Sequence, residues 1–249
     1  MRRTSALLAT ALLMGQCAAT DYRRPEPAKA DIEAAATAIR RAEMPVRSTG
    51  SDDQLIDMAD RAARRLRSNL TDICTVIASD TCSFALRITQ DDSANAFLDA
   101  KGNIWVTLKL LRHLGTEDEV GAVLAHEIGH RLNGDDLVAM SAIRNHQALG
   151  YFRGGSSPSA AASRISGAAR YAISREANAD YLAAFLLKRA GYDLHKAETV
   201  WITLYKLRDR QAASMLATHP LSAYRLAAWR KIARALDAHP DALPEMKEE

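Results

Sequence analysis

The sequence predicts an α+β fold that is mostly helical and contains one small antiparallel sheet. Alanine-rich stretches with helical periodicity occupy both halves of the chain, whereas β-branched and aromatic residues cluster between residues 84 and 107. With 249 residues, of which 48% are hydrophobic and 25% charged, the chain can bury a core of its own. Folding therefore needs neither a metal nor a disulfide framework, and any metal site would serve chemistry.

The first 19 residues have the pattern of an export signal. A basic start precedes an apolar run over residues 6–14 and a stretch of small residues over 15–19. The apolar run is too short to cross a bilayer, which needs about 20 apolar residues. The pattern allows two alternative cleavage sites. Cleavage before Cys17 would resemble that of bacterial lipoproteins, although Gln16 replaces their usual Gly or Ala, and cleavage after Ala19 would release a soluble protein.

The three cysteines fit an oxidising compartment. Cys74 and Cys82 can form a disulfide there, which leaves Cys17 as the site of lipid attachment. A bridge between Cys74 and Cys82 would close a short loop and stabilise the fold by about 2–3 kcal/mol on a chain-entropy estimate. The alternative is that both are buried, unpaired thiols.

Four regions are predicted along the chain. An export signal over residues 1–19 is followed by a Pro-rich polar tether over 20–30. A single folded domain is expected over 31–238, and a polar tail over 239–249.

The predicted domain begins with helices and a small sheet. Helical patterns run from about residue 31 to 43 and from about 51 to 70. Strands are expected over 84–89 and 104–107, with a turn over 99–103 before the second of them. Beyond this sheet the chain is predicted to be almost wholly helical.

The charge balance excludes one class of partner. The chain has 33 basic and 30 acidic residues, and its formal net charge is +3. Because this charge is too small to create a strong field, nucleic acid is not expected as a partner. Partners must instead be inferred from the sites.

The motif with chemical content is H-E-I-G-H over residues 126–130. Thr116 and Glu119 form a predicted capping box, so a helix beginning there would carry the motif inward. Histidines four residues apart share a helix face, with Cβ atoms about 5–6 Å apart, and can bind one zinc ion together. Glu127 would then stand beside the metal and could take a proton from water that the metal activates.

A catalytic zinc site requires a third protein ligand. The metzincin pattern fails, because it requires a glycine and a histidine where this chain has Asn133 and Asp136. Further along, Glu176 and Asp180 share one face of a predicted helix. One of these carboxylates can bind zinc while the other accepts the N–H of a ligand histidine. The alternative is an ordinary pair of exposed carboxylates.

Taken together, the motifs resemble the HtpX-like and CAAX-prenyl-endopeptidase-like family of zinc metallopeptidases, in particular exported bacterial members with a single anchor. The resemblance covers about residues 73–232. It includes N-A-F at 95–97, I-W-V-T at 104–107, A-H-E-I-G-H at 125–130, R-E-A-N-A-D at 175–180, and T-H-P at 218–220 with Arg225. It implies a gluzincin-type site with an edge strand beside the zinc-binding helix pair. Its zinc ligands would be His126, His130 and Glu176, and its catalytic base would be Glu127.

The resemblance also implies roles for residues around the metal. Asp180 would orient a ligand histidine, although family descriptions sometimes make it a proton donor. His219 would stabilise the oxyanion formed from the peptide carbonyl, its alternative role being a cap on the last helix. Arg225 would hold either the ligand carboxylate or the oxyanion.

The substrate site implied by the resemblance is an edge strand that contains Asn95, Ala96 and Phe97. An extended polypeptide would add to this strand and offer its backbone for hydrolysis. The alternative for Asn95 is an ordinary turn residue.

These observations predict an exported endopeptidase with one Zn²⁺ per chain that cleaves unfolded or misassembled envelope proteins. The resemblance places it in the periplasm, anchored to the outer membrane through a lipid on Cys17. A zinc-containing periplasmic chaperone or assembly factor with little proteolysis is the main alternative. A zinc-dependent aminopeptidase acting on small peptides is a third.

Overall fold

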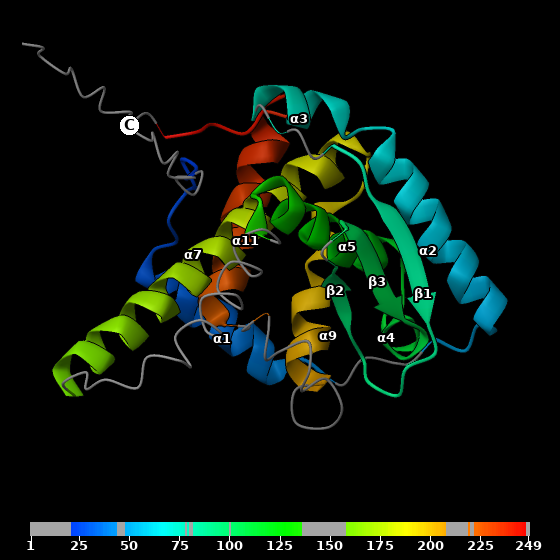
Figure 1. Cartoon of the computed structure of the whole chain (residues 1–249), viewed down its shortest axis with the longest axis horizontal. Helices are drawn as coiled ribbons and strands as arrows, with labels where there is room; N and C mark the ends of the chain where they lie inside the picture. The colour runs from blue at the N-terminus through cyan, green and yellow to red at the C-terminus, as the bar shows by residue number, and fades with distance from the viewer. Residues whose placement is uncertain are drawn as a thin grey trace, which may run out of the picture.

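The computed structural model describes residues 21–43, 48–77, 79, 82–99, 101–135, 158–207, 219 and 222–247, with the backbone alone for 158–172. Its main elements, in chain order, are α1 (Lys29–Arg41), α2 (Asp52–Arg67), α3 (Thr71–Val76), β1 (Ala85–Thr89), β2 (Ala96–Leu98), β3 (Asn103–Thr107), α4 (Leu108–His113), α5 (Glu117–Leu132), α7 (Pro158–Arg189), α8 (Leu194–Ala197), α9 (Thr199–Leu207) and α11 (Ala223–Ala238). The prediction of a mostly helical α+β fold with one small sheet is therefore confirmed (Figure 1).

The sheet is mixed, and the prediction that it is antiparallel throughout is corrected. Its strand order is β1-β3-β2. The hairpin of β2 and β3 is antiparallel, with Phe97 opposite Trp105, whereas β1 pairs with β3 in parallel, with Ala85 opposite Asn103. Successive strands alternate in direction, so the first and third run the same way. Because β3 inserts between the other two, these first and third strands become neighbours.

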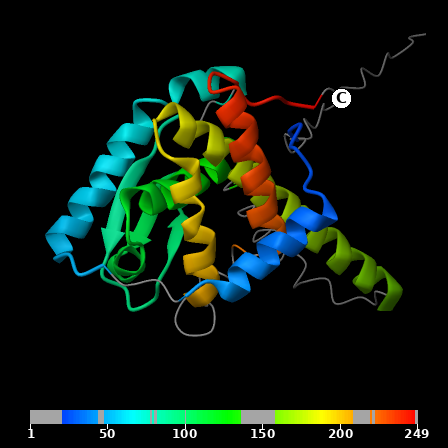
Figure 2. The ribbon, with the colours of Figure 1, turned by 180° about the vertical axis from the view of Figure 1, so that it is seen from behind.

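Helix α5 lies at the centre of the molecule. It packs against α7, α2 and the sheet, while α1 and α11 pack against each other and α11 also packs on α7. Figures 1 and 2 show the sheet and α2 on one side of α5, and α1 and α11 on the other. Nearly every residue of α5 from Glu119 onward is buried, on all faces of the helix. A helix buried all round belongs to the core, so its polar side chains require partners inside the protein.

The start of α5 is fixed by polar side chains, as the spacing of Thr116 and Glu119 predicted. The Thr116 hydroxyl accepts a hydrogen bond from the Glu119 backbone N–H at 3.2 Å. The Glu119 carboxylate, however, accepts from the Gly115 N–H at 2.6 Å instead of from Thr116. It also accepts from the hydroxyls of Thr199 and Thr203 at 2.9 Å each, so the same side chain ties α5 to α9.

Cys74 and Cys82 form a disulfide with their Cα atoms 5.9 Å apart. The bridge joins the end of α3 to the segment that leads into β1. The next residue of that segment, Ser83, accepts a hydrogen bond at its carbonyl from Arg131 Nε at 2.6 Å. The disulfide thus lies close to the end of α5 that carries the H-E-I-G-H motif.

The two ends of the described chain pack together on α7. Tyr22 is buried, pairs with Met246 in a short antiparallel bridge and places its ring 5.5 Å from that of Tyr181. The segment expected as a tether therefore has part of its length against the domain. The predicted export signal and Cys17 lie outside the described residues. Within the described part of the chain, no helix combines the length and apolar character needed to cross a membrane.

Candidate metal centre

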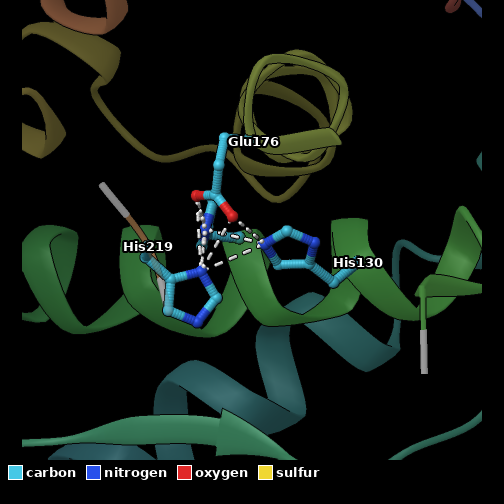
Figure 3. A group of neighbouring side chains, drawn as sticks. His130, Glu176 and His219 are labelled. Carbon is cyan, nitrogen blue, oxygen red and sulfur yellow. Dashed lines mark hydrogen bonds and ion pairs between the residues drawn. The ribbon is translucent and has the colours of Figure 1, made fainter. Parts of the chain in front are cut away.

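Two helices bring three candidate metal ligands to one point. His126 and His130 lie one turn apart on α5. Figure 3 shows Glu176 extending from α7 toward His130. The two Nε2 atoms are 3.1 Å apart, and each is 3.3 Å from an oxygen of Glu176. All three side chains are buried. Donor atoms at this mutual spacing fit one tetrahedral zinc ion with bonds of about 2.0–2.2 Å.

The close approach of α5 and α7 depends on Gly129, inside the motif. A Cβ atom at this position would lie 2.5 Å from the carbonyl oxygen of Ala179 and 2.8 Å from its Cα. Both are backbone atoms of α7, which cannot move aside as a flexible side chain could. The glycine therefore lets the two helix backbones touch, and this contact brings Glu176 within reach of the two histidines.

Asp180 and Arg225 support the candidate ligands from behind. Asp180 Oδ1 lies 2.9 Å from His126 Nδ1, which directs the opposite nitrogen of that ring toward the cluster. Arg225 donates two hydrogen bonds of 2.7 Å to Asp180 and lies 2.9 Å from Glu176 Oε2. Burial raises the pKa of Asp180, but the Arg225 guanidinium and His126 outweigh it and lower this pKa overall. Burial also raises the pKa of Glu176, but its hydrogen bonds to the histidines of the cluster outweigh burial and lower this pKa, so both carboxylates are held ionised.

His219 lies nearer to the cluster than the sequence indicated. Its Nδ1 is 3.3 Å from His126 Nε2, 3.2 Å from His130 Nε2 and 3.2 Å from Glu176 Oε1. Figure 3 shows its ring facing His130 and Glu176. The four residues together form a group whose ligand atoms all lie within 4.8 Å of one another. His219 thus stands at the position of a fourth ligand and not behind the other three.

Glu127 has a carboxylate oxygen, Oε1, close to the same cluster. The side chain is buried, and none of the described residues forms a hydrogen bond with its Oε1. His219 Nε2 lies 3.5 Å from this oxygen. A buried carboxylate oxygen without a donor is available to accept a proton.

One contact of the cluster was missed by the sequence analysis. Asp135, just beyond the end of α5, lies with Oδ2 2.6 Å from His130 Nδ1. Burial lowers the pKa of His130, but its hydrogen bonds to Asp135 and Glu176 outweigh this and raise the pKa to about 10. The only sequence signal was an aspartate shortly after the motif, and a surface loop would give the same signal.

Strand β2 carries the predicted substrate contacts. It lies at one end of the sheet, so one of its edges has no strand partner among the described residues. Ala96 is buried, whereas Phe97 is 38% exposed and stacks on Trp105 with ring centres 6.2 Å apart. Asn95 precedes the strand, exchanges hydrogen bonds with Thr107, and has a buried side-chain oxygen that no described residue contacts by a hydrogen bond.

Comparisons with known proteins agree with this geometry. Residues 60–233, more than half of the chain, match the model of Peptidase family M48. The mitochondrial metalloendopeptidase OMA1 of Arabidopsis thaliana is 30% identical over 152 residues, which are 55% of this chain and 29% of the relative. The β-barrel assembly-enhancing protease of Yersinia pestis is 28% identical over 179 residues, which are 64% and 36% of the two chains.

A third relative, the OMA1 metalloendopeptidase of Schizosaccharomyces pombe, is 24% identical over 167 residues, 62% of this chain and 48% of the relative. The matches thus span less than half of each relative. All four members of the histidine and glutamate cluster fall inside the region that matches the family model. The metallopeptidase resemblance read from the motifs is therefore confirmed at the level of the family. The chain belongs to peptidase family M48, whose members are zinc metallopeptidases.

Proposed function

We propose that this chain is an exported zinc-dependent endopeptidase with one zinc ion per chain. His126, His130 and Glu176 would hold the ion. This is supported by the two Nε2 atoms, which lie 3.1 Å apart and each 3.3 Å from one of the two carboxylate oxygens of Glu176. When bound, zinc would polarise the peptide carbonyl and lower the pKa of water toward neutrality. Proton transfer and stabilisation of the oxyanion would be carried out by side chains of the protein.

Glu127 is proposed as the general base. Its Oε1, which accepts no hydrogen bond from the described residues, can accept a proton from the attacking water and then deliver it to the amine that leaves. The surroundings of the oxygen support this role, because the side chain is buried and its proton would not be lost to solvent during transfer. Replacing Glu127 with Gln removes the base while it preserves the size of the side chain.

His219 and Arg225 are proposed to assist in different ways. His219 can donate a hydrogen bond to the oxyanion that develops on the carbonyl, provided its ring leaves the fourth ligand position to the substrate. Arg225 holds the ligand carboxylate and Asp180 in place through the bonds described above. Because Arg225 is buried behind both carboxylates, we assign it to the ligand and not to the oxyanion.

The proposed substrates are unfolded or extended polypeptides. An added strand can bind through main-chain hydrogen bonds along the edge of β2 that no described strand covers, and β2 runs beside α5. Main-chain binding of this kind accepts an internal segment of a chain, as an endopeptidase requires. It also requires that the segment be unfolded, because a folded one has no free backbone to offer.

We place the protein in the bacterial cell envelope, in the periplasm, as a component of protein quality control. The basic and apolar start of the chain and the Cys74–Cys82 disulfide both fit an exported protein. The similarity to a Yersinia protein named for β-barrel assembly supports misassembled envelope proteins as clients. A lipid on Cys17 would anchor the chain to the outer membrane.

One observation favours a second function. His219 stands where a fourth ligand would bind, and a zinc ion with four protein ligands is typical of a structural site with no position for water. If the site stays closed in this way, the chain would be a zinc-containing chaperone or assembly factor that binds clients along β2 with little proteolysis.

Digestion of casein, an unstructured protein, distinguishes these functions. If the chain is an endopeptidase, it should cut casein at internal positions. These cuts should disappear with a chelator, return with zinc, and be absent in Glu127→Gln. The chaperone predicts bound zinc without cuts and an unchanged ability of Glu127→Gln to prevent client aggregation. Stepwise trimming from the N-terminus of casein would indicate an aminopeptidase and contradict both.

A further inference from the structure

A fourth buried carboxylate, in addition to Glu127, Glu176 and Asp180, touches the metal centre and has no role in the function proposed above. Asp135 is 4% exposed and lies just beyond the end of α5. Its Oδ2 is 2.6 Å from His130 Nδ1, and its Oδ1 accepts a hydrogen bond from Arg175 Nε at 2.7 Å. The Asp135 backbone carbonyl accepts another from the same guanidinium at 2.9 Å. The two partners of Asp135 lie on the two helices that carry the candidate ligands: His130 is on α5 and Arg175 is on α7.

The contact to His130 fixes which nitrogen can bind a metal. A neutral imidazole that donates its Nδ1 hydrogen to a carboxylate has its lone pair on Nε2. In His130 this Nε2 is the atom that faces His126 and Glu176. Asp135 therefore selects the tautomer that can act as a ligand and holds the ring in the plane that points at the cluster.

The contact to Arg175 fixes the distance between the two helices at the site. Arg175 immediately precedes Glu176 in α7, so a bond from Arg175 to Asp135 spans from the end of α5 to the ligand-bearing turn of α7. The same chain of contacts, from a candidate ligand histidine to an aspartate and from that aspartate to an arginine, occurs on the other side of the cluster. There Asp180 contacts His126, and Arg225 binds Asp180.

The turn that follows α5 explains how Asp135 reaches His130. Gly134 has φ +67°, a backbone conformation that side chains disfavour. A Cβ there would meet no atom within 4 Å, so the glycine is required for the direction of the chain and not for space. The left-handed residue turns the chain back and sets Asp135 against the histidine ring.

We propose that Asp135 and Arg175 are positioning residues for the metal. Asp135 holds His130 in the tautomer and orientation that bind zinc, and Arg175 holds Asp135 while it ties His130 to Glu176. This inference rests on the proposed ligand set and not on the proposed substrates. It predicts that loss of either residue weakens zinc binding in protein that remains folded.

The test is the zinc affinity of the full chain, measured by competition with a chromophoric chelator. Removing a carboxylate that supports a ligand histidine typically costs 10–100-fold in metal affinity. We expect a loss of about 10-fold in Asp135→Asn, which keeps an acceptor oxygen, and up to about 100-fold in Asp135→Ala. The zinc affinity of Arg175→Gln should lie between that of the wild type and that of Asp135→Ala. The double variant should bind zinc only slightly more weakly than Asp135→Ala alone, because the contact of Arg175 that survives in Asp135→Ala goes to the backbone carbonyl and not to a group that touches His130.

Asp237→Asn is the matched control. Asp237 lies on α11, 2.7 Å from Lys188 of α7 and 2.8 Å from His195. Its replacement removes these surface ion pairs and is predicted to leave zinc affinity unchanged. The absorption spectrum of the cobalt-loaded protein reports ligand geometry directly and should change in Asp135→Ala but not in Asp237→Asn. Thermal unfolding of the zinc-free proteins shows whether each variant is folded.

A folded Asp135→Ala variant with wild-type zinc affinity and an unchanged cobalt spectrum would overturn the inference, whatever its melting temperature. His130→Ala separates this result from failure of the ligand set. If His130→Ala loses zinc and Asp135→Ala does not, only the positioning role is wrong. If His130→Ala also binds zinc as the wild type does, the ligand set itself is wrong, and the inference falls with it.

Discussion

Gly129→Ala is predicted to force apart the two helices that hold the metal site. The new methyl group would lie 2.5 Å from the Ala179 carbonyl oxygen, whereas ordinary contact begins near 3.4 Å. The helices must therefore separate by about 0.9 Å, the difference between these two distances, at the point of contact. Overpacking of this kind costs about 1–3 kcal/mol in the free energy of unfolding. The better helix propensity of alanine offsets about 0.5–1 kcal/mol of this loss of stability.

Gly121→Ala is the matched control, because it makes the same exchange two turns earlier in α5. There the added methyl group would meet side-chain atoms of Tyr192 and Leu187 at 3.1–3.3 Å, and these can shift by a few tenths of an ångström. We expect its stability within about 1 kcal/mol of the wild type and its zinc affinity unchanged. Urea unfolding of the zinc-free proteins and zinc competition measure both quantities. Wild-type stability and zinc affinity in Gly129→Ala would refute the claim that backbone contact sets the ligand geometry.

Three further predictions follow from individual contacts. In the zinc-free protein His130 has a pKa of about 10, above the ordinary value of 6.5, so its proton stabilises the fold fully below pH 6.5 and this stabilisation is lost as the pH rises toward 10. Zinc must displace the same proton, so zinc affinity should rise over this interval, and a pH-independent affinity would contradict the assignment. Arg225→Ala removes the guanidinium from two buried carboxylates, Asp180 and Glu176, and should lower the free energy of unfolding of the zinc-free protein by about 3–5 kcal/mol in urea titrations; a loss below 1 kcal/mol would show that these two ion pairs are unimportant. Replacing Cys74 and Cys82 with Ser should cost about 2–3 kcal/mol under oxidising conditions and nothing in the presence of a reductant, and an equal difference in both conditions would point to packing instead of the bridge.

The parts of the structure that the sequence predicted are those that depend on local spacing. Two histidines four residues apart must share a helix face, and Glu176 and Asp180 share one for the same reason. Thr116 marked the start of α5 through the preference of its hydroxyl for a backbone N–H at a helix N-terminus. In each case the geometry follows from one element alone.

The parts that the sequence did not predict depend on contacts between distant segments. The parallel pairing of β1 with β3 requires that β3 insert between two other strands, which no local pattern specifies. Asp135 looks like a loop residue until the turn at Gly134 brings it to His130. His219 reaches the ligand atoms from a segment 89 residues after His130. Its sequence context indicated a role near the metal but not its distance from it.

The central claim is that Glu176 of α7 completes a zinc site begun by the two histidines of α5. Zinc content after dialysis against a chelator, compared between Glu176→Gln and Glu198→Gln, tests it most directly. Glu198 pairs with Arg230 at 2.8 Å, outside the cluster, and serves as the matched carboxylate. One zinc per chain is expected in the wild type and in Glu198→Gln, and loss of zinc is expected from folded Glu176→Gln. Retention of a full zinc equivalent by Glu176→Gln would contradict it.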